Sequence, residues 1–267
     1  MNNAKIGFIG VGNIAGAIIG GICKQGYIKP ENIYIYDVDD RKYDNFSKYG
    51  VKACAVTEDV INNSDYIFLT VKPNNCDTVM SSVKDMNITG KCFVSVMAGV
   101  SIAKLKSYVG NAKVIRVLPN TPLLLSCGAT AIAYEAPVTE EDYDFIYGVF
   151  SSCGLAVKVR EEDMDTAIAV SSSAPAYYFL LAKAGVEYAK SCGMDSESAL
   201  KLFAKTLEGS GRMLTESGMT PDELIRMVTS PGGTTQAALE SFEENGFADI
   251  FVKGMESAAE KSKRLVK

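Results

Sequence analysis

The sequence predicts an α/β fold in which a doubly wound, mainly parallel sheet occupies residues 1–160 and an all-helical domain occupies residues 161–267. Two observations support this division. Up to about Arg160, short runs rich in β-branched residues alternate with amphipathic segments, which is the pattern of strands joined by crossover helices. Beyond Arg160 the chain is rich in Ala, Leu, Glu and Lys and has no further β-rich run. The first half is therefore expected to carry the sheet.

The expected strands of the first domain are short apolar runs. In order they are Ile6–Ile9, Ile33–Tyr36, Val51–Ala55, Tyr66–Val71, Phe93–Val96, Val114–Val117, Ala129–Ala133 and Ala156–Val159. Between them, Ile14–Lys24, Cys76–Met86 and Glu140–Phe150 have the periodicity and length of crossover helices. Glycines near the ends of such segments act as stop signals and support these boundaries.

The second domain has its own start and stop signals. A long helix is expected from about residue 163 to residue 191, with a bend near Pro175 because proline interrupts the helical hydrogen bonds. Asp195 then has the position of an N-cap for the next helix. Thr220 and Glu223 have the spacing of a capping box, which predicts a short helix after them.

Composition excludes several classes of partner. The formal net charge of -5 and the pI near 5.0 provide no basic surface, so we expect binding to neither nucleic acid nor an anionic membrane. The apolar stretch at residues 174–186 is interrupted by Pro175 and Lys183 and is shorter than the roughly 20 residues of a membrane span, so it predicts a buried helix. The first residues lead into a strand without a basic leader, which predicts a cytoplasmic protein.

The chain contains no histidine, and this absence limits the possible chemistry. Ser-His and Cys-His nucleophile pairs and histidine zinc sites are excluded. The seven cysteines are irregularly spaced and form no Cys-x-x-Cys pair, which is typical of unpaired thiols. No metal site is therefore expected.

A glycine-rich loop follows the first expected strand. Its sequence is Gly10-Val11-Gly12-Asn13-Ile14-Ala15, a Gly-x-Gly-x-x-Ala pattern at the point where a strand passes into a helix. The first glycine permits the tight turn, the second lets a pyrophosphate approach the backbone, and the alanine allows the helix to pack close to the sheet. Because the free amides of the helix N-terminus face the phosphates, the loop predicts a Rossmann-type dinucleotide site at Gly10, Val11, Gly12, Asn13 and Ile14.

An acidic residue follows the second expected strand. Asp37 lies where a carboxylate accepts hydrogen bonds from the adenosine ribose and repels a 2′-phosphate, which favours NAD. Arg41 is close enough in sequence to pair with a 2′-phosphate, which favours NADP. We therefore expect NADPH or NADH as the cofactor, with the choice left open.

Three further segments complete a family pattern. They are Thr70-Val71-Lys72-Pro73, the run from Val114 to Pro122 that contains Pro-Asn-Thr-Pro, and Thr229-Ser230-Pro231-Gly232-Gly233-Thr234-Thr235. Together with the Gly10 loop, and in this order and spacing, they resemble the pyrroline-5-carboxylate reductase family over essentially the whole chain. The resemblance implies reduction of 1-pyrroline-5-carboxylate to L-proline by hydride transfer from the nicotinamide, which is the last step of proline biosynthesis.

The segment from Ser230 to Thr235 also has a physical logic of its own. Pro231, Gly232 and Gly233 predict a turn, after which Thr234 or Thr235 opens a helix whose free amides can bind a substrate carboxylate. A threonine that simply caps its helix is the alternative explanation. The resemblance implies that Gly232, Gly233 and Thr234 bind substrate and that the hydroxyl of Thr235 contacts the imine nitrogen as the catalytic group.

The resemblance assigns further residues to the crevice at the carboxyl ends of the strands. Thr70, Val71, Lys72 and Pro73, together with Met97, Ala98 and Gly99, are implied to hold the nicotinamide half of the cofactor. Lys72 could instead act as a catalytic acid. Asn120 is implied to orient the substrate, or it only shapes the turn that contains it.

The sequence departs from the family pattern at three positions. Ser172 and Ala174 stand in Ser171–Tyr177 where the family has glycines, and side chains there narrow any close approach of this helix. Thr57 stands where many members carry an asparagine near the adenosine phosphate. The apolar helix around residues 177–180, taken with the resemblance, implies a homodimer formed by the C-terminal helices, which could assemble further.

Two alternatives remain open at this point. The first is a related reductase for another imine or for a β-hydroxyacid, and the latter chemistry would use a lysine in the helical half, where Lys183 is the candidate. The second is a binding-only member that has lost catalysis, which the altered Ser171–Tyr177 segment suggests. The Thr235 hydroxyl favours an active enzyme.

Overall fold

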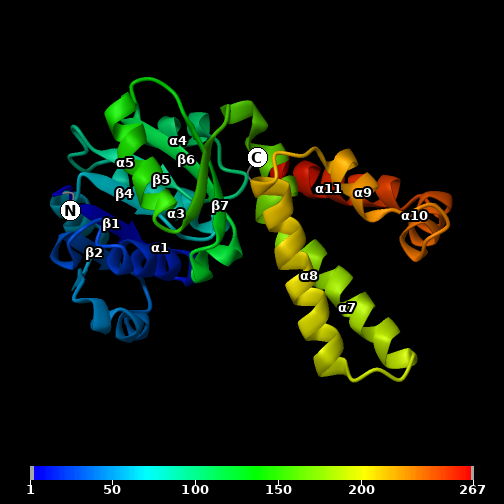
Figure 1. Ribbon diagram of the computed structural model, residues 1–267. Coiled ribbons are helices and arrows are strands. Elements are labelled where there is room, and N and C mark those ends of the chain that lie inside the picture. Colours follow the sequence, from blue (N-terminus) through cyan, green and yellow to red (C-terminus); the bar gives the residue numbers. More distant parts are fainter. Residues whose placement is uncertain (1–2, 266–267) are drawn as a thin grey trace. The chain divides into compact units, whose positions relative to one another are not determined.

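The computed structural model describes residues 3–265 (Figure 1). Within this range the chain divides into two compact units, one that runs to Pro175 and resumes at Ala258, and one at Ala176–Ser257. The first unit contains the whole sheet, and the elements of the second are helices. The division into compact units follows the contacts within the chain and does not test a domain boundary in the sequence. The boundary expected at residue 160 therefore stays a prediction.

The sheet has eight strands, and each expected strand is present. They are β1 (Ile6–Ile9), β2 (Ile33–Tyr36), β3 (Lys52–Ala53), β4 (Tyr66–Leu69), β5 (Cys92–Ser95), β6 (Lys113–Pro119), β7 (Gly128–Tyr134) and β8 (Gly154–Lys158), in the order β3-β2-β1-β4-β5-β6-β7-β8. Strands β1 to β6 are parallel, β7 is antiparallel to β6, and β8 is parallel to β7. The doubly wound, mainly parallel prediction is confirmed, with a Rossmann strand order up to β6.

Helices cover both faces of the sheet. One apolar cluster contains side chains of α1 (Asn13–Lys24) and α5 (Glu140–Ser151), and the other contains side chains of α2 (Thr57–Asn63), α3 (Cys76–Val83) and α4 (Ile102–Val109). The remaining short helices of this unit are η1 (Pro30–Asn32), η2 (Asp40–Asn45), η3 (Ser47–Tyr49), η4 (Pro73–Asn75), η5 (Thr121–Leu125), η6 (Glu161–Asp163), α6 (Met164–Ala167) and the π-helical η7 (Ile168–Ser172).

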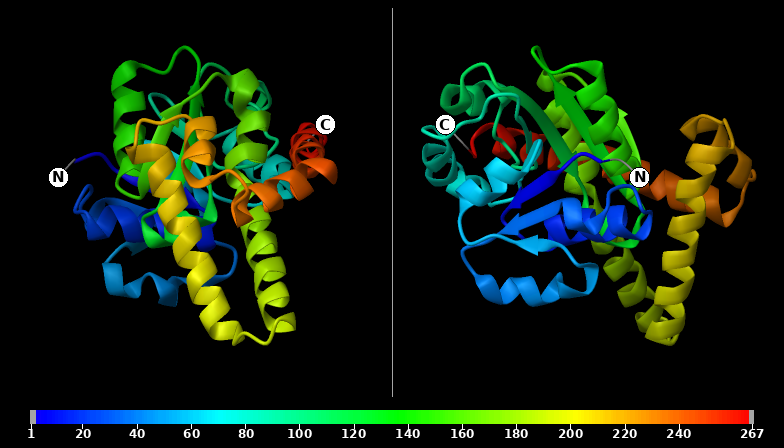
Figure 2. Two further views of the ribbon diagram at one scale, coloured as in Figure 1. Left: turned by 45° about the vertical axis from the view of Figure 1, so that its right-hand side comes forward. Right: turned by 90° about the vertical axis from the view of Figure 1, so that its left-hand side faces the viewer.

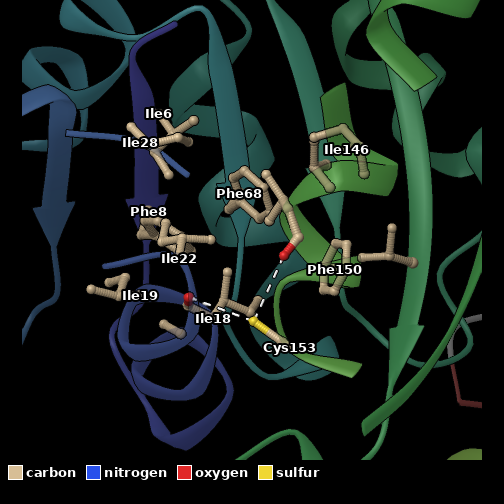
Figure 3. Close-up of a cluster of buried hydrophobic side chains, with 14 of the residues drawn as sticks. Ile6, Phe8, Ile18, Ile19, Ile22, Ile28, Phe68, Ile146, Phe150 and Cys153 are labelled. Atoms are coloured by element: carbon tan, nitrogen blue, oxygen red, sulfur yellow. Dashed lines mark hydrogen bonds between the residues drawn. The ribbon is translucent and has the colours of Figure 1, made fainter. Parts of the chain in front are cut away.

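The core on the α1 face is tightly packed (Figure 3). Phe8 on β1 and Phe68 on β4 stack with ring centroids 4.7 Å apart. The thiol of Cys153 lies 3.9 Å from the Ile18 carbonyl oxygen, and burial raises the pKa of this thiol. A Cβ atom on Gly21 would lie 2.1 Å from the Cys153 sulfur, so this position of α1 requires glycine. The close packing holds α1 in place against the core of the first unit.

Asp142 ties α5 to the sheet. One carboxylate oxygen, Oδ2, accepts hydrogen bonds from the Thr139 backbone N–H at 2.9 Å and lies 2.7 Å from Lys113 Nζ on β6. Burial alone would raise the pKa of Asp142, but hydrogen bonds from Lys113 and Thr139 and the charge of Lys113 lower it below the ordinary value. The ionised carboxylate therefore stabilises the folded state.

We expect Asp142→Asn to lower the free energy of unfolding at neutral pH. Because the folded pKa lies below the unfolded value of about 3.9, the contribution is complete above that value and is lost as pH falls through the folded pKa. Urea unfolding at pH 7 and near pH 3 should show the difference from the unchanged protein shrinking in acid. Glu141→Gln, on the same helix turn with an exposed side chain, is the control. A difference that persists unchanged in acid would contradict this account.

The second unit is built from long helices. Its elements are α7 (Ala174–Ser191), α8 (Ser196–Glu216), α9 (Pro221–Val228), α10 (Thr234–Glu244) and α11 (Phe247–Lys263), of which α7 begins and α11 ends in the first unit. Helices α7 and α8 run side by side in opposite directions (Figure 2). A Cβ on Gly185 would lie 2.8 Å from the Phe203 ring, so glycine allows these helices to approach closely.

The predicted helix signals are confirmed at two positions and corrected at a third. Asp195 caps α8 by accepting from the Ser198 N–H at 2.8 Å, and Thr220 and Glu223 form the capping box of α9. The long helix expected at residues 163–191 is divided into α6, the π-helical turn η7 and α7, and the bend expected near Pro175 falls at Ser173. Pro175 instead lies in the first turn of α7, where its missing N–H removes no hydrogen bond.

Much of the apolar surface of the second unit is exposed in the single chain. Phe179, Leu180, Tyr188, Leu202 and Ile250 each expose between 62% and 71% of their surface. Patches of this kind usually mark an interface. Over residues 3–265, none of the helices has the length and apolar character needed to cross a membrane.

Candidate active site and cofactor site

Five of the predicted segments follow the carboxyl ends of neighbouring strands. The Gly10 loop follows β1, Asp37 follows β2, Thr70 follows β4, Met97 comes soon after β5 and Asn120 follows β6. Since these strands are parallel, the segments lie along one edge of the sheet. The order reverses between β1 and β4, and that is where doubly wound sheets bind their ligands.

The glycine loop is held by hydrogen bonds from both sides. The Gly10 N–H donates to the Tyr36 carbonyl oxygen at 2.7 Å, and the Thr70 hydroxyl donates to the Gly10 carbonyl oxygen. Gly10 has φ +92°, and a Cβ there would lie 2.8 Å from a methyl of Val71 and 3.0 Å from the Thr70 backbone. Only glycine fits this position without strain.

The N-terminus of α1 is open to a ligand. Gly12 is the N-cap, and among the described residues no side chain caps the helix and none of its first-turn residues is acidic. Gly12 and Asn13 are exposed, and a Cβ on Gly12 would meet none of the described atoms within 4 Å. Free amides of this kind bind phosphate, so the geometry fits the pyrophosphate of a dinucleotide.

Asp37 is buried, and four donor contacts reach its carboxylate. Oδ2 accepts from the Val11 N–H at 2.8 Å, and Oδ1 accepts from the Asp39 N–H at 3.0 Å. Lys42 Nζ lies 2.9 Å from both oxygens. Arg41, the expected partner for a 2′-phosphate, instead binds Asp39 through two nitrogens and has a side chain 86% exposed. Lys42 was not among the residues expected at this site.

The two turns expected to hold the nicotinamide differ in exposure. Lys72 is exposed and Thr70 is half-buried beside Gly10, so this turn can reach a ligand next to the glycine loop. The Met97 side chain lies in the core, which leaves only its backbone for such a role. A Cβ on Gly99 would lie 2.7 Å from the Ser262 carbonyl oxygen, so Gly99 packs against the end of α11.

The side-chain carbonyl oxygen of Asn120 already accepts a hydrogen bond within the protein. Its Oδ1 accepts from the Ala129 N–H at 2.9 Å, while its Nδ2 lies 3.5 Å from both oxygens of Ser171, at the limit of hydrogen bonding. The carbonyl half therefore shapes the turn between β6 and β7, and the N–H₂ group is the part that can donate to a substrate.

The altered segment Ser171–Tyr177 starts at the end of the π-helical turn η7 and continues into the first turn of α7. Ala174 is buried, so the core of the first unit accommodates its methyl group. The Ser172 hydroxyl oxygen is buried and has no hydrogen-bond partner within residues 3–265. The effect of these two side chains on substrate binding stays a prediction.

The turn at residues 230–235 has the expected form. Gly233 is the N-cap of α10, and its N–H donates to the Ser230 carbonyl oxygen at 3.0 Å. The Gln236 side chain, which the sequence analysis did not single out, closes the turn by accepting from the Gly232 N–H at 2.8 Å. Among the described residues no side chain caps α10, unlike the side chains that cap α8 and α9. The first amides of α10 are thus available to an anion.

Comparison with known proteins decides the family. Residues 161–265 match a family model described as pyrroline-5-carboxylate reductase dimerisation, and residues 5–99 match one described as NADP oxidoreductase, coenzyme F420-dependent. The chain is 37% identical to the pyrroline-5-carboxylate reductase of Methanosarcina acetivorans, with 100% of both chains covered. The chain belongs to the pyrroline-5-carboxylate reductase family. The Escherichia coli pyrroline-5-carboxylate reductase is 36% identical, with 98% of each chain covered.

Solved structures of this reductase family have the same fold. The pyrroline carboxylate reductase of Plasmodium falciparum, determined with NADP bound, has a TM-score of 0.90 at 30% identity, and 100% of each chain is covered. The pyrroline-5-carboxylate reductase of Coxiella burnetii has a TM-score of 0.92 at 31% identity, again with 100% of each chain covered. The predicted family and the predicted NAD(P)-binding Rossmann fold are confirmed, while the individual site residues stay predictions.

Lys183, the candidate base of a β-hydroxyacid reductase, has no special environment in the second unit. Its side chain is 71% exposed, and its ammonium lies 3.8 Å from Glu187 one helical turn away. This is an ordinary surface ion pair. The described contacts of Lys183 therefore do not mark it as a catalytic group.

Proposed function

We propose that the protein reduces 1-pyrroline-5-carboxylate to L-proline with NADPH or NADH, the last step of proline biosynthesis. The strongest support is membership of the reductase family over the full length of the chain. The open N-terminus of α1 and the uncapped turn before α10 add support from geometry, because the first suits a pyrophosphate and the second a carboxylate.

The cofactor, when bound, supplies a hydride for C5 of the cyclic imine. The amides at Gly12, Asn13 and Ile14 bind its pyrophosphate. Thr70, Val71, Lys72 and Pro73, with the backbone of Met97, Ala98 and Gly99, line the nicotinamide half. These residues position the cofactor and need no proton transfer of their own.

The substrate carboxylate binds the amides at the start of α10, where Gly232 and Gly233 let the backbone approach it and Thr234 adds a donor. Thr235 orients the ring through its hydroxyl oxygen, which accepts a hydrogen bond from the N–H of the protonated imine. A protonated imine accepts hydride readily, so hydride supplied by a bound cofactor would add to C5 and the proton on nitrogen would remain in the product. Catalysis is then mainly positioning.

We also propose that the enzyme is a cytoplasmic homodimer formed by the C-terminal helices. The exposed apolar side chains of α7, α8 and α11 support the dimer, as does the match to the dimerisation model. Seven cysteines without a disulfide are consistent with a reducing compartment.

Thr235→Ala should lower kcat/KM for 1-pyrroline-5-carboxylate by about tenfold to a hundredfold, because one hydrogen bond to the reacting group is lost. Thr235→Ser keeps a hydroxyl and should retain a substantial part of the activity. The measurement is the substrate-dependent initial rate of NADPH and of NADH oxidation.

Thr215→Ala is the matched control, since the Thr215 hydroxyl donates only to carbonyl oxygens of its own helix. This variant should keep full activity. Failure of the unchanged protein to oxidise either cofactor, despite measurable cofactor binding, would reject the proposal and favour another imine substrate or a binding-only function. Equal rates for Thr235→Ala and the unchanged protein would reject only the role of the hydroxyl.

A further inference from the structure

We propose that Lys42 makes this enzyme selective for NADPH, by neutralising Asp37 and by donating a hydrogen bond to the 2′-phosphate of the adenosine ribose. The inference deepens the proposed function and rests on it only for the location of the dinucleotide site. It reverses the preference for NAD that Asp37 alone would predict.

The carboxylate of Asp37 has no free hydrogen-bonding capacity among the described residues. A carboxylate offers about four acceptor positions. Here Oδ1 accepts from the Asp39 N–H and from Lys42 Nζ, and Oδ2 accepts from the Val11 N–H and from Lys42 Nζ. All of these positions are filled, so a ribose hydroxyl cannot bind Asp37 unless one donor leaves.

The donors differ in how easily they can leave. The N–H groups of Val11 and Asp39 belong to the backbone on either side of the carboxylate and move only if the loops move. Lys42 is the donor on a flexible side chain. Burial alone would raise the pKa of Asp37, but hydrogen bonds from Lys42 and the two backbone amides, with the lysine charge, lower it below the ordinary value. Asp37 is thus ionised at neutral pH and paired with Lys42.

Lys42 retains one donor for a ligand. An ammonium group has three N–H bonds, and the two contacts to Asp37 use two of them. The Lys42 side chain is 39% exposed, whereas that of Asp37 is 6% exposed, so the ammonium lies between the carboxylate and solvent. A 2′-phosphate that approaches from solvent would contact the Lys42 ammonium. The same ammonium would neutralise the charge of the buried Asp37 carboxylate.

Arg41 is the competing candidate, and its geometry is less favourable. Its Nε and Nη2 atoms bind the two oxygens of Asp39 at 2.7 and 3.0 Å. The guanidinium would have to leave this paired arrangement to bind a phosphate, whereas Lys42 can do so without leaving Asp37. The pairing of Lys42 with Asp37 therefore carries the selectivity.

The test compares two fragments of the cofactors by calorimetric titration. Adenosine 2′,5′-bisphosphate represents the adenosine half of NADPH, and adenosine 5′-monophosphate represents that of NADH. The unchanged protein should bind the bisphosphate at least about tenfold more tightly, a free-energy difference of about 1.4 kcal/mol. Lys42→Met, which keeps the apolar stem, should reduce this ratio to one or below, because Asp37 becomes free to accept the ribose hydroxyl and repels the 2′-phosphate.

Three further variants complete the test. Lys42→Arg should keep the preference for the bisphosphate. Lys48→Met also removes one positive charge, but the Lys48 ammonium lies over the Tyr49 ring, so this variant should leave the ratio unchanged. Arg41→Met should also leave it unchanged. A ratio that is unaltered in Lys42→Met, or that collapses in Arg41→Met, would overturn the assignment.

This experiment separates the inference from the proposed function. Binding of both fragments with an unaltered ratio in Lys42→Met would refute the role of Lys42 and leave the reductase proposal intact. Binding of neither fragment by the unchanged protein would reject the cofactor site itself, and the inference would fail with it.

Discussion

Gly10→Ala is expected to lower the affinity for NADPH and NADH by about a thousandfold. At φ +92° an alanine costs about 1–2 kcal/mol, and the contacts of its methyl group with Val71 and the Thr70 backbone add about 1–3 kcal/mol. The loop relieves this strain by moving away from β4, which displaces the amides that bind the pyrophosphate. A loss of about 4 kcal/mol corresponds to the expected factor. Titration of both cofactors measures it.

Gly50→Ala is the matched control for this prediction. Gly50 also has a positive φ, +77°, but a Cβ there meets none of the described atoms within 4 Å. The variant should lose about 1 kcal/mol of stability and keep its cofactor affinity. Unchanged cofactor affinity in Gly10→Ala would mean that the glycine loop does not bind the dinucleotide.

Arg116→Ala is expected to lower the free energy of unfolding by about 3–5 kcal/mol, because it leaves partners of a buried cation unpaired. Arg116 lies on β6 with its side chain 4% exposed. Its Nη1 donates to Glu161 Oε1 at 3.1 Å, and its Nη2 lies 3.6 Å from Asp165 Oδ1. Asp165 also accepts from the Ser262 hydroxyl at 2.6 Å, so the network joins the sheet to the end of α11. Denaturant unfolding measures the loss.

Arg160→Ala is the control for the buried cation. Arg160 carries the same charge and pairs with Glu162 and Asp163, but its side chain is 72% exposed. Exposed ion pairs contribute little, so the control should unfold like the unchanged protein. In Arg116→Ala, additional replacement of Asp165 by Asn should recover part of the stability, because one unpaired carboxylate is removed. If Arg116→Ala and Arg160→Ala lowered the free energy of unfolding equally, burial of the Arg116 ion pairs would make no additional contribution to stability.

The sheet could be predicted because its strands carry a strong local signal. The central strands β1, β2, β4, β5 and β6 are buried apolar runs, and β1, β2 and β4 begin at the expected residues. The reversal at β7 was not predicted from composition, since antiparallel and parallel strands have similar runs. The connection could have revealed it, because only residues 120–127 separate β6 from β7 and a parallel crossover needs about a dozen or more residues.

The candidate site was predictable where backbone geometry dictates the residue type. Gly10 and the turn before α10 need glycine, so their sequence is informative. The pairing of Asp37 with Lys42 was not predictable, because it depends on the directions in which the Arg41 and Lys42 side chains point. The 3₁₀ geometry of η2 turns Lys42 toward Asp37, and its neighbour Arg41 pairs with Asp39. The π-helical turn η7 likewise has no periodic signature in the sequence.

The contact between Gly99 and the end of α11 has a consequence for the order of events during synthesis. The first unit consists of the chain up to Pro175 and the chain from Ala258 onward, so it is discontinuous in sequence. A ribosome that has released residues 3–175 has not yet supplied Ser262 or Leu265, which cover Gly99, nor the hydroxyl that binds Asp165. While the helical unit is translated, Gly99 and Asp165 of the nascent Rossmann unit therefore lack their contacts with the C-terminal residues. These contacts form only after residues 258–265 have emerged from the ribosome.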